Sequence, residues 1–203
     1  SQEGGAVDEI EQKRKSIVEQ ERTSIVGLLT PGQKERLSTL TGEPFDFTRV
    51  TRTLPRAPEL QSSREQWLQG SPTTLAELRG QIVIVHFYAF ECINCKRNLP
   101  HYAAWHRDYA NKGLVVIGIQ TPETPAECDV AKVTAAIAQE GIKYPVLMDA
   151  DANNWQEWGT TMWPSVYLID REGYLRTWWQ GELNWQGNPG EQKMRAQIEQ
   201  LLK

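Results

Sequence analysis

Residues 82–100, IVIVHFYAFECINCKRNLP, decide the fold. The segment opens with an unbroken run of β-branched residues, Ile82 to Val85, which is typical of a strand buried on both faces. The strand leads directly into Cys92-Ile93-Asn94-Cys95, where a helical pattern begins. Two thiols three positions apart share the first turn of a helix, close enough to form a disulfide. The free N–H groups and positive dipole end of that turn favour a thiolate on the first cysteine, so the spacing predicts a redox site.

The composition is that of a globular protein with one sizeable core. Of the 203 residues, 39% are hydrophobic and 24% are charged, and the net charge is -4. This balance gives no electrostatic reason to bind nucleic acid or an acidic membrane. No apolar run approaches the roughly 20 residues that a membrane-spanning helix needs. The polar start, residues 1–5, is no signal peptide, but export would have removed one, so it does not decide the localisation.

Residues 1–42 are predicted to form a helical extension. From residue 7 to residue 29 the apolar side chains fall on about a third of a helix circumference. We expect an amphipathic helix here, either with solvated charges or as a surface for a partner or a second copy. Thr30-Pro31-Gly32-Gln33 is a capping box that starts a short helix to about Leu40. Residues 43–65 contain three prolines and are predicted to be a linker, or a strap across the next domain.

Residues 66–203 are predicted to form the main domain. Helices interleaved with buried strands, followed by a hairpin and a last helix, predict an α/β sandwich around a central mixed β-sheet. The expected strands lie at 67–72, 82–87, 114–119, 144–148, 165–169 and 174–178, and the expected helices begin near residues 93, 124 and 188.

Pro100 lies inside the helix that follows the cysteines, and this order of strand, CxxC, helix and proline resembles the active-site unit of the thioredoxin fold. From Trp67 to about Glu182 the chain resembles the TlpA/ResA-like branch of the thioredoxin superfamily, most closely the C-terminal domain of DipZ-type proteins. The matching segments are LAELRG (75–80), CINC (92–95), NLPH (98–101), GIQTPE (118–123), GIKYPV (141–146) and WPSVYLID (163–170).

The resemblance implies a thiol–disulfide oxidoreductase in which Cys92 attacks and Cys95 resolves the mixed disulfide. It implies a cis bond between Trp163 and Pro164, facing the cysteines and offering backbone to an extended substrate. No flavin, nicotinamide or metal is implied, because the dithiol itself carries the electrons. The implied partners are proteins with thiols or disulfides and an upstream redox partner, in the periplasm or cell envelope.

Two positions depart from the family pattern. His86 stands six residues before the first cysteine, where thioredoxins carry a buried aspartate. Asn98 stands three residues after the second cysteine, where ResA-like proteins carry a glutamate. Both family acids help to move the proton when the mixed disulfide resolves. His86, Glu123, Glu91 or water are the candidates for that role, and the sequence does not choose among them.

Other interpretations of the thiols remain. The two cysteines, together with His101 and His106, superficially match the ligands of a zinc site. Alternatively, the two thiols bind copper or zinc in order to deliver it to another protein. However, histidines five apart on one helix lie about 140° apart around its axis and do not converge easily on one ion. A peroxidase would need a hydroxyl three residues before the cysteine, where the chain has Ala89. The alternative to an oxidoreductase is that the domain is a non-catalytic binding or scaffold module. Cys128, on the predicted helix that starts at residue 124, is expected to be a spare thiol.

Overall fold

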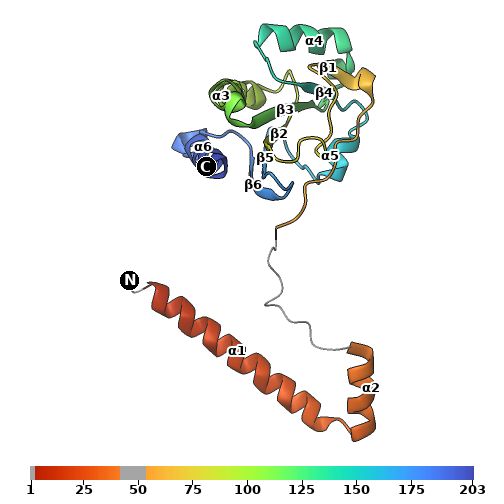
Figure 1. Cartoon of the computed structure of the whole chain (residues 1–203), viewed down its shortest axis with the longest axis vertical. Helices are drawn as coiled ribbons and strands as arrows, with labels where there is room; N and C mark the ends of the chain where they lie inside the picture. The colour runs from red at the N-terminus through yellow and green to blue at the C-terminus, as the bar shows by residue number, and fades with distance from the viewer. Residues whose placement is uncertain (1–2, 42–53) are drawn as a thin grey trace. The chain divides into compact units, whose positions relative to one another are not determined.

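The computed structural model describes residues 3–41 and 54–203 (Figure 1). The chain divides into two compact units, Ser1–Thr53 and Leu54–Lys203. The second unit starts before the predicted boundary at residue 66 because residues 54–65 pack onto it. The Ala57 N–H donates to the Gly173 oxygen at 3.0 Å, and the Leu175 N–H donates to the Pro55 oxygen at 2.9 Å. Residues 54–65 of the predicted linker or strap thus belong to the second unit, and the earlier part of that segment lies outside the described residues.

Two helices make up the described part of the first unit, α1 (Glu3–Leu28) and α2 (Pro31–Thr41). The capping box forms as predicted, since the Thr30 N–H donates to Gln33 Oε1 at 2.9 Å and the Gln33 N–H donates to Thr30 Oγ1 at 3.4 Å. Along α1, Ile17, Val18 and Ile25 are exposed. No helix in the two described ranges is long and apolar enough to cross a membrane.

The second unit is built on one mixed six-stranded sheet, as predicted. Its strands are β1 (Trp67–Gln69), β2 (Ile82–Tyr88), β3 (Leu114–Gln120), β4 (Val146–Met148), β5 (Ser165–Ile169) and β6 (Leu175–Gln180). Their order is β1-β4-β3-β2-β5-β6. β2, β3 and β4 run parallel, whereas β1, β5 and β6 pair antiparallel with their neighbours. Every residue of β2 is buried, including His86, which agrees with the prediction of a strand buried on both faces.

Helices cover both faces of this sheet. They are α3 (Ile93–Tyr109), α4 (Val130–Gln139), α5 (Asn153–Glu157) and α6 (Gly190–Leu202). Alternate residues of β2 face opposite ways, so Ile84 joins a core with α3, α4 and α6, while Val85 joins a second core beneath Leu60 and Leu75. Figure 1 shows α3 and α6 on one side of the sheet and α5 on the other. The sequence did not predict α5.

The single helix predicted from residue 124 is wrong. The structure has a 3-10 helix, Pro125–Cys128, and α4 begins afresh at Val130. Asp129 between them is extended, and its carboxylate accepts the N–H groups of Ala131 and Lys132. An aspartate is a strong N-cap, so it divides the helical pattern in two.

The start of the last helix also differs from the prediction. Pro189 occupies the N-cap of α6 and no side chain caps it there. Instead, Asn184 Oδ1 accepts the Glu191 N–H at 3.3 Å from the preceding loop. The buried face is confirmed at Met194 and Ile198, and the two leucines at the end of the helix are half-buried.

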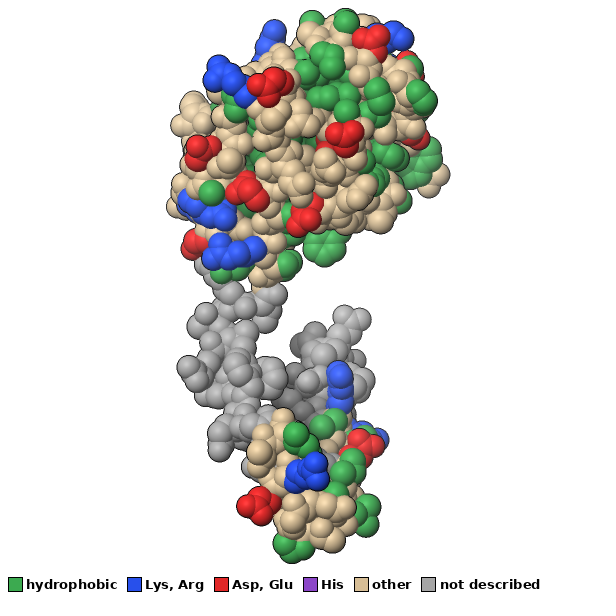
Figure 2. Space-filling model, turned by 90° about the vertical axis from the view of Figure 1, so that its right-hand side faces the viewer, with side chains coloured by type: hydrophobic (Ala, Val, Ile, Leu, Met, Phe, Trp, Pro, Cys, Tyr) green, Lys and Arg blue, Asp and Glu red, His purple; other side chains and the backbone are tan. Residues whose placement is uncertain are grey.

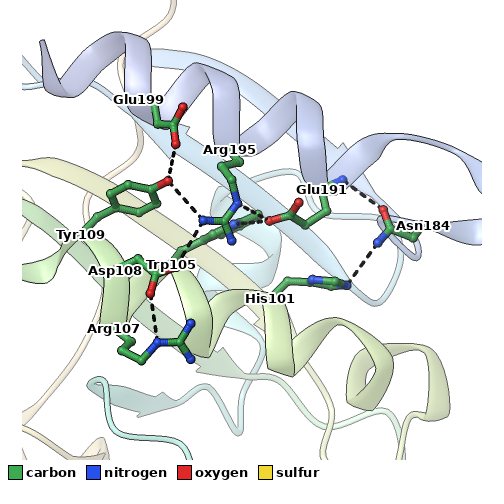
Figure 3. A network of polar contacts seen from close by, with 9 residues as sticks. All are labelled: His101, Trp105, Arg107, Asp108, Tyr109, Asn184, Glu191, Arg195 and Glu199. Atoms are coloured by element: carbon green, nitrogen blue, oxygen red, sulfur yellow. Dashed lines mark hydrogen bonds and ion pairs between the residues drawn. The ribbon is translucent and has the colours of Figure 1, made fainter.

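A polar network joins α6 to α3, the helix that carries the cysteines (Figure 3). Arg195 is its centre: its Nε donates to Glu191 at 2.8 Å and its Nη1 donates to the Tyr109 hydroxyl at 3.1 Å. The Trp105 indole N–H donates to the same Glu191 at 2.9 Å, and the Tyr109 hydroxyl donates to Glu199 at 2.5 Å. The network therefore fixes α6 against the far half of α3.

On the face drawn in Figure 2, acidic and basic side chains are both present, and neither charge dominates. This agrees with the small net charge of -4.

Candidate active site

The sheet topology brings three loops together beside the CxxC sequence. β2 and β3 are parallel, so their carboxyl ends lie at the same edge of the sheet, and β5, antiparallel to β2, begins there. The loops are also bonded to one another. The Thr121 N–H donates to the Tyr88 oxygen at 3.0 Å, and the Trp163 indole N–H donates to the Thr121 oxygen at 3.1 Å. Residues that are far apart in the sequence thus form one site.

The two cysteines have different surroundings. Cys92 is the N-cap of α3 and is half-buried, and its Sγ accepts the Cys95 N–H at 3.2 Å. Cys95 lies in the first turn and has no exposed surface. Both are free thiols in this structure. Cys92 is therefore partly accessible from solvent, whereas Cys95 is not.

The electrostatics separate the two thiols further. The pKa of Cys92 is lowered to about 7, chiefly by the hydrogen bond with the Cys95 thiol and also by the N–H groups of Cys95 and Asn94. Burial and the negative charge of Glu123 act in the opposite direction. Burial, together with the hydrogen bond to Cys92, raises the pKa of Cys95 far above its ordinary value. Cys92 is therefore the thiol that ionises near neutral pH.

A buried carboxylate, Glu127, ties the loop before Cys92 to the loop after β3. Glu127 has no exposed surface. Its Oε1 accepts the Glu91 N–H at 2.9 Å, and its Oε2 accepts the N–H groups of Glu123 at 2.7 Å and Thr124 at 2.9 Å. The sequence shows the capping box of Thr124 and Glu127 but not the bond to Glu91, which is 36 residues away. Sequence reasoning therefore missed Glu127 as a residue of the site.

Glu91 and Glu123 are both exposed at this site. The Glu123 charge raises the pKa of Cys92 and of Cys95, so this carboxylate is electrostatically coupled to both sulfurs. Glu91 precedes Cys92 in the chain, and its backbone is held by Glu127.

His86 lies in a buried aromatic cluster behind the cysteines. Its Nε2 is 3.1 Å from the Tyr144 hydroxyl, and its ring stacks on Tyr102 with the centroids 4.2 Å apart. Burial lowers the pKa of His86 to about 3, so the ring is neutral at pH 7. Tyr88 lies in the same cluster, and burial and the Cys95 charge raise the pKa of its phenol. No sequence pattern marks these tyrosines as neighbours of His86.

Asn98, the second departure from the family, is buried and fully engaged. Its Nδ2 donates to the Gly181 oxygen at 3.0 Å and to the Tyr102 hydroxyl at 3.2 Å, and its Oδ1 accepts the Leu183 N–H at 3.0 Å. It fastens α3 to the loop after β6. A neutral amide thus has a structural role at the position where ResA-like proteins carry an acid.

The Trp163–Pro164 peptide bond is cis, as the resemblance implied. The Trp163 ring is half-buried and stacks on Trp155 with the centroids 4.0 Å apart. Its indole N–H is the group bonded to Thr121, so the ring is held against the loop that also carries Glu123.

The remaining candidates lie apart from the thiols. His101 Nε2 is 3.4 Å from the Asn184 amide (Figure 3), and His106 packs edge-on against Tyr144. Across residues 3–41 and 54–203, no three or more His, Cys, Asp or Glu side chains are grouped to hold a metal ion. Cys128 is exposed at the end of the 3-10 helix before α4.

Comparison with known proteins agrees with this geometry. The model of the AhpC/TSA family matches residues 55–177. Protein DipZ of Mycobacterium tuberculosis is 39% identical over 113 residues, which are 54% of this chain and 16% of DipZ. The thiol-disulfide oxidoreductase ResA of Bacillus anthracis is 29% identical over 106 residues, 52% of this chain and 58% of ResA. The chain thus spans less than two thirds of each of these relatives.

Among solved structures, a thiol:disulfide interchange protein of the thioredoxin family from Chlorobium tepidum superposes with a TM-score of 0.58. It is 22% identical and the alignment covers 75% of this chain and 99% of that protein, which shows that the fold is thioredoxin-like. The chain therefore belongs to the AhpC/TSA family, and its similarity to DipZ and ResA confirms the resemblance to the TlpA/ResA branch.

Proposed function

We propose that this chain is a thiol–disulfide oxidoreductase that exchanges disulfides with protein partners through Cys92 and Cys95. The observation that best supports this proposal is that the two thiols differ in exposure and in pKa. Cys92 is half-buried with a pKa of about 7, whereas Cys95 is fully buried with a strongly raised pKa. An accessible thiolate beside a protected thiol is what a two-step exchange needs.

In the reducing direction the Cys92 thiolate attacks one sulfur of a substrate disulfide. A new S–S bond joins Cys92 to the substrate, and the other substrate sulfur leaves as a thiolate that takes up a proton. Cys95 then loses its proton and attacks Cys92, which releases the second substrate thiolate. The enzyme pair is oxidised by two electrons and the substrate is reduced by two. The oxidising direction follows the same steps in reverse.

For the proton of Cys95, we favour Glu123 among the candidate side chains His86, Glu123 and Glu91. Its charge acts on both sulfurs, and its exposed carboxylate can exchange protons with water. His86 is a poor proton acceptor at neutral pH because burial lowers its pKa to about 3. Glu91 is exposed, but its charge is not among the causes that shift the pKa of either thiol.

Trp163 and Pro164 are proposed as the surface on which an extended substrate segment lies, because their loop is bonded to the loop beside Cys92. The proposed partners are proteins with thiols or disulfides and an upstream redox protein, in the periplasm or cell envelope. This location rests on the resemblance to the TlpA/ResA branch.

The test is reduction of insulin by dithiothreitol, with the 203-residue chain as catalyst. Cys92→Ser should lower the catalysed rate by at least about a thousandfold, because it removes the nucleophile. Cys128→Ser is the matched control and should leave the rate unchanged. If Cys92→Ser retained the rate, the chain would be no oxidoreductase at this site, and a binding module or a metal-delivery protein would take its place.

The direction of exchange follows from the reduction potential of the cysteine pair, measured in glutathione or dithiothreitol buffers. A potential near thioredoxin's roughly -270 mV marks a reductant of partner disulfides, whereas one near roughly -120 mV marks an oxidant.

A further inference from the structure

The buried carboxylate of Glu127 has more bonds than a helix cap requires. A capping box uses the side chain to accept one N–H of its own turn. Glu127 accepts the N–H groups of Thr124, Glu123 and Glu91 at 2.7–2.9 Å. The last of these comes from the loop that ends at Cys92. One carboxylate with no exposed surface thus holds two loops in a fixed relation at the nucleophile.

The two residues that Glu127 holds outside its own cap are both exposed glutamates. Glu91 is next to Cys92 in the chain, and the Glu123 charge acts on both sulfurs. The cations that follow on α3 offset these charges only in part. Arg97 is bound to Glu182 at 2.7 Å, which leaves Lys96 as the cation of this turn outside that ion pair. The entrance to Cys92 therefore has an acidic rim, defined here as Glu91 and Glu123.

We propose that Glu127 is a positioning residue that holds this acidic rim beside Cys92, and that the rim selects substrates whose reacting cysteine is flanked by lysine or arginine. This inference rests on the proposed exchange activity and names the substrate class for it. Opposite charges on rim and substrate attract in the encounter complex, and like charges repel.

A cation from the substrate also acts on the chemistry. The Glu123 charge opposes ionisation of Cys92 in the free chain, because the carboxylate and the thiolate are both negative and repel each other. A lysine or arginine beside the substrate disulfide offsets that charge when it docks, so the thiolate is favoured in the complex with a basic substrate. An acidic substrate adds a further negative charge and has the reverse effect.

The experiment compares two short peptide disulfides that differ only in the residues flanking each cysteine, lysine in one and glutamate in the other. The measured quantity is the second-order rate constant for oxidation of the reduced 203-residue chain, at low and at high ionic strength. The lysine peptide should react about tenfold faster at low salt, and the ratio should approach one at high salt, since exposed charges are screened.

Variants of Glu123 and Glu127 test whether these residues cause the difference in rate constant between the lysine peptide and the glutamate peptide. Glu123→Gln removes the rim charge and should lower the ratio by about two- to fivefold. Glu127→Gln retains the Glu123 charge but loses at least one of its three bonds, and it should lower the ratio as well. A purely structural role for Glu127 would change both rate constants equally and leave their ratio unchanged. Glu140→Gln, at the end of α4, changes the net charge equally and should leave the ratio unchanged.

The outcomes separate the two proposals. If neither peptide oxidises the cysteine pair, the proposed function fails. If both peptides react at equal rates, the exchange activity stands and the charge selection is overturned. A ratio that Glu123→Gln lowers but Glu127→Gln does not, with Glu127→Gln folded by circular dichroism, overturns the positioning role. Glu123→Gln changes an exposed side chain, so the rim can be tested even where Glu127→Gln does not fold.

Discussion

The same four-residue pattern begins a helix in each of the two units, with different results. Thr30-Pro31-Gly32-Gln33 precedes α2, and Thr124-Pro125-Ala126-Glu127 opens the 3-10 helix before α4. Both form the reciprocal bonds of a capping box. Gln33 is exposed, and within the described residues its side chain bonds to Thr30. Glu127 is buried and also bonds to the loop at the candidate active site.

This difference shows what a local pattern specifies. The pattern satisfies the free N–H groups of its own turn, so it predicts where a helix starts. Whether the capping side chain has a second role depends on what packs against it, and in the unit 54–203 the sheet supplies a neighbouring loop. The second unit contains two buried hydrophobic clusters, whereas Ile17, Val18 and Ile25 of α1 are exposed. We therefore expect the second unit to respond far more strongly to changes at its buried polar groups.

The largest expected difference between the two units is in how much stability each loses at low pH. All three histidines lie in residues 54–203, and burial lowers the pKa of His86 from 6.5 to about 3. Below pH 6.5, His86 binds a proton in the unfolded chain but not in the folded chain. The free energy of unfolding is therefore highest above pH 6.5 and decreases as the pH falls from 6.5 to about 3. At about 1.4 kcal/mol per pH unit the loss is about 5 kcal/mol.

Tryptophan fluorescence in urea titrations at several pH values measures this loss, because all eight tryptophans lie in residues 54–203. His86→Phe keeps a ring to stack on Tyr102 and should reduce the pH dependence. A pH dependence that survives this substitution at full size would contradict the assignment to His86.

The next effect separates the two capping boxes. Glu127→Ala leaves three backbone N–H groups without their acceptor in a buried site, so the free energy of unfolding should fall by about 3 kcal/mol or more. The measurement is the urea midpoint from tryptophan fluorescence. Gln33→Ala is the matched control and should leave that midpoint unchanged. Equal shifts for the two variants would show that the boxes do not differ in the way described here.

The helix starts themselves can be compared through their N-caps, Cys92 on α3 and Thr30 on α2. Because the pKa of Cys92 is lowered to about 7, its alkylation by iodoacetamide should rise about tenfold from pH 5 to pH 6 and level off above pH 8. Mass spectrometry of alkylated peptides resolves Cys92 from exposed Cys128, whose rate serves as the internal reference. A Cys92 rate that keeps rising about tenfold per pH unit above pH 8 would argue against the lowered pKa of this thiol.

The smallest effect is expected at the exposed box. Thr30→Ala removes the N-cap of α2 and should cost about 1 kcal/mol, confined to that helix. Circular dichroism at 222 nm should show a small loss of helix, and the exchange rate with insulin should stay at that of the unmodified chain. A change in the exchange rate would reveal a link between the N-terminal helices and the thiol site.

The parts that could be predicted from the sequence are those that local physics determines. β2 begins with four β-branched residues, Ile82 to Val85, and the CxxC follows the strand at a helix start, so the position of Cys92 needs no long-range information. Trp163 and Pro164 came from the family resemblance, because an X-Pro bond alone does not indicate the cis form.

The parts that were missed depend on packing between distant segments. The partners of His86 come from α3 and the loop before β4, and the bond between Glu127 and Glu91 spans 36 residues. Asp129 can cap a helix, but the capping box of Thr124 and Glu127 just before it also predicts a helix start, and the sequence does not show that two separate helices begin there. Short α5 has five residues, too few for a periodic pattern.

The complete burial of Cys95 also bears on how the site withstands oxygen damage. Oxidants convert a thiol first to sulfenic acid and finally to sulfonic acid, which is irreversible. A thiol is more susceptible to this oxidation the more it is ionised and exposed. Cys95 has neither, so a peroxide meets Cys92 first. A sulfenic acid formed there lies beside a thiol that condenses with it to a disulfide and releases water. The first oxidative lesion is thereby converted into a state that ordinary reductants restore.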